Sequence, residues 1–77
     1  MLALTIDERD YKSPFAFCDR LRAVLSTGRC IHLRPSPPCG FFIVQNGPAI
    51  LATDFDKRPI GTFSSLTDAL AAWERSR

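Results

Sequence analysis

The stretch FFIVQNGPAILATDFDKRPIGTF, residues 41–63, carries the pattern that decides the fold. Its first four residues are all apolar, which predicts a central strand covered on both faces. An Asn-Gly turn signal follows at residues 46–47. Because Pro48 has no N–H to donate, we expect a looser loop there than a two-residue turn. A returning strand over residues 49–55 and, after the turn DKRP, a short last strand over residues 60–63 complete the pattern.

A further strand precedes this region and is separated from it by a proline-rich connector. The run CIHLR, residues 30–34, alternates between apolar and polar side chains. The prolines at positions 35, 37 and 38 then remove backbone donors and favour extended geometry, so residues 35–39 cannot join the sheet. We expect a rigid connector. Because a preordered segment loses little chain entropy on binding, this connector could also form part of an interface.

Two amphipathic helices flank the strands. The first begins with Ser13 as N-cap and Pro14 in its first turn, and Gly28 is placed for a left-handed C-cap. Its apolar stripe consists of Phe17, Cys18, Leu21, Val24 and Leu25. The second helix follows a capping-box pattern from Ser65 to Asp68. Its apolar face consists of Leu66, Ala69, Leu70 and Trp73.

The alternation of Leu2, Leu4 and Ile6 adds a first strand over residues 2–6. The resulting order is β-α-β-β-β(-β)-α. We therefore predict one α+β domain over residues 1–77, with a mostly antiparallel sheet of four to five strands and two helices on one face.

Composition limits the classes of function. The chain has 77 residues, of which 45% are hydrophobic, and this content argues against disorder. Its net charge of +2 is too small for binding driven strongly by phosphate. A core this small gains from an oligomer or a partner, so a homodimer is possible. We expect no targeting signal and no membrane-spanning segment, because the apolar run at residues 2–6 is short and no longer one follows. Three cysteines exclude a complete disulfide framework, and we expect reduced thiols in the cytoplasm.

The cysteines and the single histidine have ligand chemistry but not ligand spacing. Cys18, Cys30, His32 and Cys39 are residue types that bind zinc. They lack the close pairs of a zinc knuckle, and Cys18 belongs to a core stripe, so we predict no metal and no cofactor. Ser36 and Cys39 lie in no nucleophile motif, and we predict no catalytic residue. An enzyme or metal protein built on Cys30, His32 and Cys39 is kept as an alternative.

Candidate contact residues lie in three places. Residues 20–34 hold four arginines and no acid, the one charge segregation in the chain. Phe15 is the aromatic residue off the apolar stripe of the first helix, and the turn after residue 53 presents mixed charge. We predict partner contacts at Phe15, Arg20, Arg22, Arg29, Arg34, Asp54, Asp56, Lys57 and Arg58. Solvated helix flanks and ordinary turn chemistry are the alternative interpretations of these residues.

Residues 42–74 resemble a small phage-encoded anti-CRISPR protein acting on type I systems. The shared features are a strand, an Asn-Gly turn, a strand, a glycine-containing strand and a helix. They are carried by Asn46, Gly47, Ile50, Ala52, Gly61, Phe63, Ser65 and Trp73. The first half of the chain differs, with an early helix where that protein begins with strands. The resemblance implies stoichiometric inhibition of a CRISPR surveillance complex by occupation of its surface, and it transfers no binding residue.

These observations together predict a small, non-enzymatic protein-interaction protein. We expect a phage or mobile-element inhibitor that binds and blocks a larger protein or ribonucleoprotein complex in the cytoplasm. The alternative is a nucleic-acid-associated domain that uses the arginines of residues 20–34.

Overall fold

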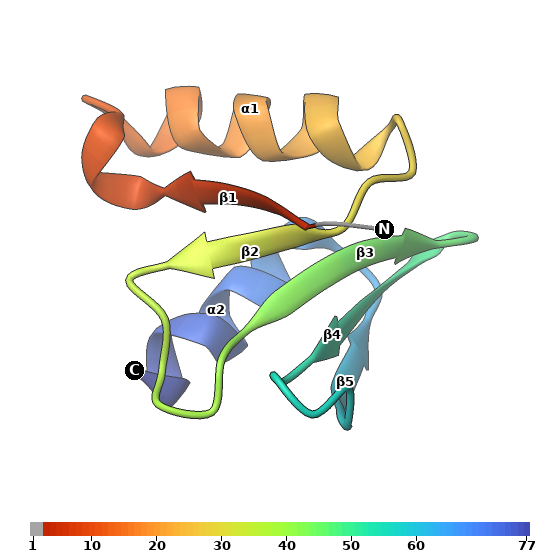
Figure 1. Ribbon diagram of the computed structural model, residues 1–77. Helices are drawn as coiled ribbons and strands as arrows, with labels where there is room; N and C mark the ends of the chain where they lie inside the picture. The colour runs from red at the N-terminus through yellow and green to blue at the C-terminus, as the bar shows by residue number, and fades with distance from the viewer. Residues whose placement is uncertain (1–2) are drawn as a thin grey trace.

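The computed structural model describes residues 3–77 (Figure 1). Met1 and Leu2 lie outside the described residues, so the predicted start of the first strand at residue 2 is not tested. The elements in chain order are β1 (Leu4–Asp7), the 3-10 helix η1 (Glu8–Asp10), α1 (Pro14–Leu25), β2 (Ile31–Arg34), β3 (Phe42–Asn46), β4 (Ala49–Thr53), β5 (Pro59–Phe63) and α2 (Leu66–Ser76).

The five strands form one mixed sheet in the order β1-β2-β3-β4-β5. Strand β1 pairs with β2 in parallel, across the α1 crossover, and the three remaining pairs are antiparallel. The prediction of an α+β domain with two helices and a mostly antiparallel sheet is therefore confirmed. In Figure 1, α1 runs alongside β1 and β2, whereas α2 crosses behind the middle of the sheet.

Each of the two α-helices begins directly after a serine whose hydroxyl caps its first turn. The Ser13 hydroxyl accepts a hydrogen bond from the N–H of Ala16, and the Ser65 hydroxyl accepts one from the N–H of Asp68, each at 3.2 Å. After α1, Gly28 has φ +82° and donates its N–H to the carbonyl of Leu25. This positive φ explains why glycine suits the end of the helix.

The hairpin between β3 and β4 is tighter than expected. Asn46 pairs directly with Ala49, which leaves only Gly47 and Pro48 in the loop. The expectation of a looser loop is therefore wrong. Gly47 has φ +61°, and a glycine with positive φ at the first loop position is typical of a type II′ turn. Such a turn is closed by the N–H of the residue after the loop, so the missing donor of Pro48 costs nothing.

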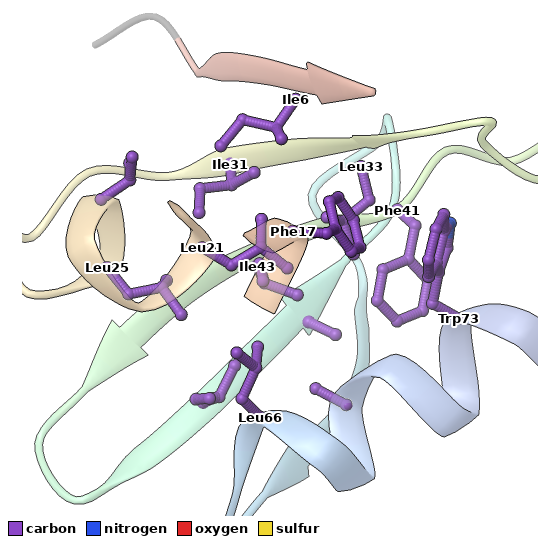
Figure 2. Packing of buried hydrophobic residues seen from close by; sticks show 14 residues of the cluster. Ile6, Phe17, Leu21, Leu25, Ile31, Leu33, Phe41, Ile43, Leu66 and Trp73 are labelled. Atoms are coloured by element: carbon purple, nitrogen blue, oxygen red, sulfur yellow. The ribbon is translucent and has the colours of Figure 1, made fainter. Parts of the chain in front are cut away.

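The core is one cluster to which the sheet and both helices contribute (Figure 2). Phe17 of α1 and Trp73 of α2 meet in it, with ring centroids 5.8 Å apart. Figure 2 shows their rings beside Leu33 and Phe41. The buried residues are Ile6, Phe17, Leu21, Val24, Leu25, Ile31, Leu33, Phe41, Ile43, Ile50, Ala52, Leu66, Ala69 and Trp73. Cys18 packs partly buried against this cluster, as a small hydrophobic residue.

The expectation that residues 41–44 are covered on both faces is wrong. Phe41 and Ile43 are fully buried, whereas Phe42 and Val44 are only half-buried. Successive strand residues point to opposite faces, so Phe42 and Val44 lie on the face that points away from the core. Through the pairing register, this outer face also includes His32, Leu51 and Thr53.

The proline connector is held at both ends by hydrogen bonds and does not join the sheet. Trp73 donates its indole N–H to the carbonyl of Pro35 at 2.9 Å, and the Arg34–Pro35 peptide bond is cis. Farther along, the N–H of Gly40 donates to the carbonyl of Pro37, and the N–H of Phe55 donates to that of Cys39 at 2.8 Å. The connector is therefore attached to α2 and to the loop that follows β4.

Candidate binding surfaces

The loop between β4 and β5, residues 54–58, is organised by one carboxylate. Oδ1 of Asp54 accepts hydrogen bonds from the N–H groups of Asp56 and Arg58, both at 2.9 Å. The N–H of Lys57 donates to the main-chain carbonyl of Asp54, and Lys57 has φ +64°. Asp54 is therefore a structural residue of the turn, whereas the side chains of Asp56, Lys57 and Arg58 are exposed.

On one side of this loop lies a hollow of about 410 Å³ next to the proline connector, which we call the proline cleft. Its lining is mostly apolar and consists of Pro37, Pro38, Cys39, Gly40, Asp54, Ile60 and Ser76. Ile60 is 41% exposed. It belongs to an irregularity in the β4–β5 register, where Ala52 pairs with Gly61 but Thr53 pairs with Pro59.

A second, smaller hollow of about 220 Å³ adjoins the same loop, and we call it the aromatic cleft. Its lining consists of Ala3, Cys30, Phe42, Thr53, Asp54, Phe55 and Lys57. The rings of Phe42 and Phe55 meet nearly at right angles, with centroids 5.5 Å apart. Phe55 is 55% exposed and lies two residues after the end of β4.

His32, on the outer face of the sheet, contacts the rings of both Phe42 and Phe55. Its imidazole stacks on Phe42 at 4.5 Å between centroids and meets Phe55 edge-on at 5.5 Å. Nε2 is buried and has no hydrogen-bond partner among residues 3–77. Burial, and then the charge of Arg34, lower the pKa of His32 below its ordinary value.

The cysteines do not assemble with His32 into a metal site. Burial raises the pKa of the Cys30 thiol, which keeps it protonated, and Cys39 is exposed on the connector. Across residues 3–77 no three His, Cys, Asp or Glu side chains gather closely enough to hold a metal ion. Asp54 and Asp56, two of the predicted contact residues, belong to one turn in which the backbone N–H of Asp56 donates to Oδ1 of Asp54.

The four arginines of residues 20–34 do not share one surface. Arg22 lies 3.7 Å from Asp19 and lines a groove near the start of α2, on the helix side of the sheet. Arg34 is exposed at the end of β2 and alternates with the buried Leu33, so it lies on the outer face. Arg20 is exposed on α1, and Arg29 is exposed in the turn after it.

Arg34 also has an acid opposite it in the sheet. It pairs in register with Asp7, whose carboxylate holds Arg9 through hydrogen bonds of 3.0 and 2.6 Å. The hydrogen bonds from Arg9, with a smaller contribution from the charge of Arg34, lower the pKa of Asp7 to about 2. Acid and base therefore alternate at this end of the sheet, which weakens any attraction for phosphate.

Phe15 stands apart from both clefts. It is 82% exposed in the first turn of α1, the most exposed large apolar side chain in the described part of the chain. Phe17, two residues later, is buried against Tyr11 and Trp73. The prediction that Phe15 lies off the apolar stripe is confirmed.

Comparison with protein families, with curated proteins and with solved structures gives no match. The resemblance of residues 42–74 to anti-CRISPR proteins therefore stays a prediction. Over residues 3–77, no helix has the length and apolar character needed to cross a membrane.

Sequence reasoning missed Phe42, Phe55 and Ile60 as surface residues. The run of residues 41–44 predicts a strand buried on both faces, but Phe42 faces outward. The strand expected over residues 49–55 ends at Thr53, so Phe55 lies in the loop. Ile60 lies in a strand, as expected, but is exposed. The available signal for Phe55 was its position between two aspartates, because an aromatic residue inside a charged turn has no core to enter.

Proposed function

We propose that this chain is a small, non-enzymatic protein-interaction protein that binds a larger protein or complex through the proline cleft and the loop beside it. The observation that carries the proposal is the mostly apolar, 410 Å³ cleft in which Ile60 stays 41% exposed. Asp56 and Arg58 are exposed in the same loop as Asp54, which lines the cleft, and they provide charged groups near it. An apolar centre with a polar rim is the usual anatomy of a protein interface.

The rigidity of the cleft supports the same proposal. Hydrogen bonds from Trp73 to the carbonyl of Pro35 and from the N–H of Phe55 to the carbonyl of Cys39 fix the connector on one side. The carboxylate of Asp54 fixes the loop on the other side. Because these segments are already ordered, little conformational entropy is lost when a partner binds.

Affinity capture with matched variants tests the surface. Tagged wild-type protein is incubated with a bacterial lysate at low salt, and retained proteins are identified by mass spectrometry. Ile60→Asp should lose the retained partner, because it places a charge in the apolar cleft. Thr67→Asp adds the same charge at an exposed position in the first turn of α2, where an acid is favourable, and should keep it. Unchanged capture by Ile60→Asp in folded form would reject this surface.

The finer proposal is a phage or mobile-element inhibitor of the anti-CRISPR type, acting in the bacterial cytoplasm. It is supported by the strand, turn and helix layout of residues 42–74 and by the binding cleft. In cells with an active type I CRISPR system, expression of the protein should restore transformation by a targeted plasmid. Interference that persists at full expression would remove this assignment, while the capture experiment would still decide the coarser one.

A further inference from the structure

The aromatic cleft lies on the outer face of the sheet, and its lining shares only Asp54 with that of the proline cleft. Phe42 and Phe55 both line it, with ring planes at 74°. His32 stacks on Phe42 at 4.5 Å and meets Phe55 edge-on, so neighbouring rings hold both walls of the cleft in place. Phe55 nevertheless remains 55% exposed. A flat ring that stacks on one of these two rings meets the other edge-on, and both arrangements are favourable for aromatic pairs.

We propose that the aromatic cleft binds one base of a single-stranded nucleic acid, with the adjacent phosphate held by Lys57. The volume of about 220 Å³ lies below the range that holds drug-sized ligands and suits a single flat heterocycle. Every nucleobase has a π-face, so stacking on phenylalanine does not require a particular sequence. Thr53 and Asp54 line the same cleft, and a hydroxyl and a carboxylate are groups that can pair with the polar edge of a base.

A cation in the lining of the cleft suits the phosphate of this ligand. Lys57 lines the cleft and makes no salt bridge with any residue from 3 to 77. Asp54 is the acid in the lining, and two backbone N–H groups donate to its Oδ1. Asp54 keeps its negative charge, so the lining carries one charge of each sign, and the ammonium group of Lys57 is the group that can pair with a phosphate. With one such cation, affinity should depend mainly on stacking and only moderately on salt.

The proposed nucleic-acid site is the aromatic cleft, and none of the dispersed arginines of residues 20–34 lines it. It does not depend on the proposed protein interface, because Ile60 lines the proline cleft and not the aromatic cleft. A protein with both surfaces would suit a partner complex that contains a single strand. The two proposals can fail separately.

Fluorescence anisotropy with a labelled oligothymidine of about ten nucleotides tests the inference at low salt. Phe55→Ala should weaken binding about 5- to 140-fold, which corresponds to the loss of one stacked base. Phe55→Leu keeps the apolar volume and should also weaken binding, which separates stacking from folding. Lys57→Ala should weaken binding and reduce its salt dependence. Phe15→Ala removes an equally large exposed ring outside the cleft and should change nothing.

Two further probes distinguish the source of the interaction. An abasic oligonucleotide with the same number of phosphates should bind much more weakly, and equal binding would mean that only charge is recognised. Thymidine monophosphate should bind more weakly than the oligonucleotide, and equal affinity would overturn the single-strand assignment. No oligonucleotide binding by the wild type, or full binding by Phe55→Leu, would also overturn it. If Phe55→Ala loses a captured protein while oligonucleotide binding is unchanged, the cleft belongs to the protein partner.

Discussion

The indole N–H of Trp73 donates a hydrogen bond of 2.9 Å to the main-chain carbonyl of Pro35, thirty-eight positions earlier in the chain. Trp73 is 1% exposed, and its ring contacts Phe17 in the core. The guanidinium of Arg77 covers the same ring at 4.3 Å from its centroid. One side chain therefore joins the core, the last turn of α2 and the proline connector, and the position of the proline cleft depends on it.

Trp73→Phe should destabilise the protein by about 1–3 kcal/mol. The variant keeps an aromatic ring in the core but leaves the Pro35 carbonyl without its donor. Urea unfolding is monitored by circular dichroism and not by tryptophan fluorescence, because the variant lacks the single tryptophan of the chain. Trp73→Ala should cost more, about 3–5 kcal/mol, through the cavity it creates. A Phe variant as stable as the wild type would show that this hydrogen bond contributes nothing.

Gly40→Ala should destabilise the protein more than Gly47→Ala. Both glycines have positive φ, +86° and +61°, so both alanine variants are strained by about 1–2 kcal/mol. Only at Gly40 would the new Cβ meet another group, the ring of Phe55 at 2.8 Å. This overlap should add about 1–3 kcal/mol and displace the ring. Nothing lies within 4 Å of a Cβ at Gly47, which makes it the matched control.

The combination of Gly40→Ala with Phe55→Ala identifies the source of that cost. Removal of the ring should recover most of the difference between the two glycine variants, because the overlapping atoms are gone. Thermal unfolding of the two single variants and the double variant gives the coupling energy. Strictly additive effects would place the cost in the backbone of the connector instead of in its contact with Phe55.

Local patterns were enough to predict the elements of this fold. Caps at Ser13 and Ser65 and the apolar stripes of both helices depend on neighbours within one or two turns, so the sequence displays them directly. Which face of a strand is covered depends on segments far away in the chain. The apolar run of residues 41–44 was therefore assigned two covered faces, although Phe42 and Val44 turn outward.

The candidate surfaces were predicted only in part, for the same physical reason. The turn chemistry of Asp54 and the exposure of Phe15 are local properties and could be inferred. The proline cleft needs the connector, β5 and the end of α2 together, and the aromatic cleft needs β2, β3 and the loop after β4. No single stretch of the sequence contains all the residues that form either cleft. The alternation of charge around Arg34 likewise arises from its pairing with Asp7.

Asp54→Ala should loosen the β4–β5 loop and lower stability by about 1–2 kcal/mol. The substitution removes the acceptor of two backbone N–H groups, those of Asp56 and Arg58. Asp56→Ala removes one negative charge from an exposed position in the same turn and should change stability by less than about 0.5 kcal/mol. Hydrogen exchange of the amides of Asp56 and Arg58 gives the local readout. Equal protection of these amides in both variants would contradict the role given to the carboxylate.

The stability of the protein should fall on acidification through His32, the single histidine of the chain. Its pKa in the folded protein lies below the ordinary value of 6.5, because burial and Arg34 disfavour the charged imidazole. Between the folded and unfolded pKa values the unfolded chain binds more protons, so stability rises with pH in that window. The full contribution is present above about pH 6.5 and is lost as pH falls toward the folded pKa.

Urea midpoints measured from about pH 5 to pH 8 should show this slope in the wild type and not in His32→Phe. Phe55→Ala, which uncovers the imidazole, should reduce the slope, and an unchanged slope in either variant would show that protonation of His32 is not its cause.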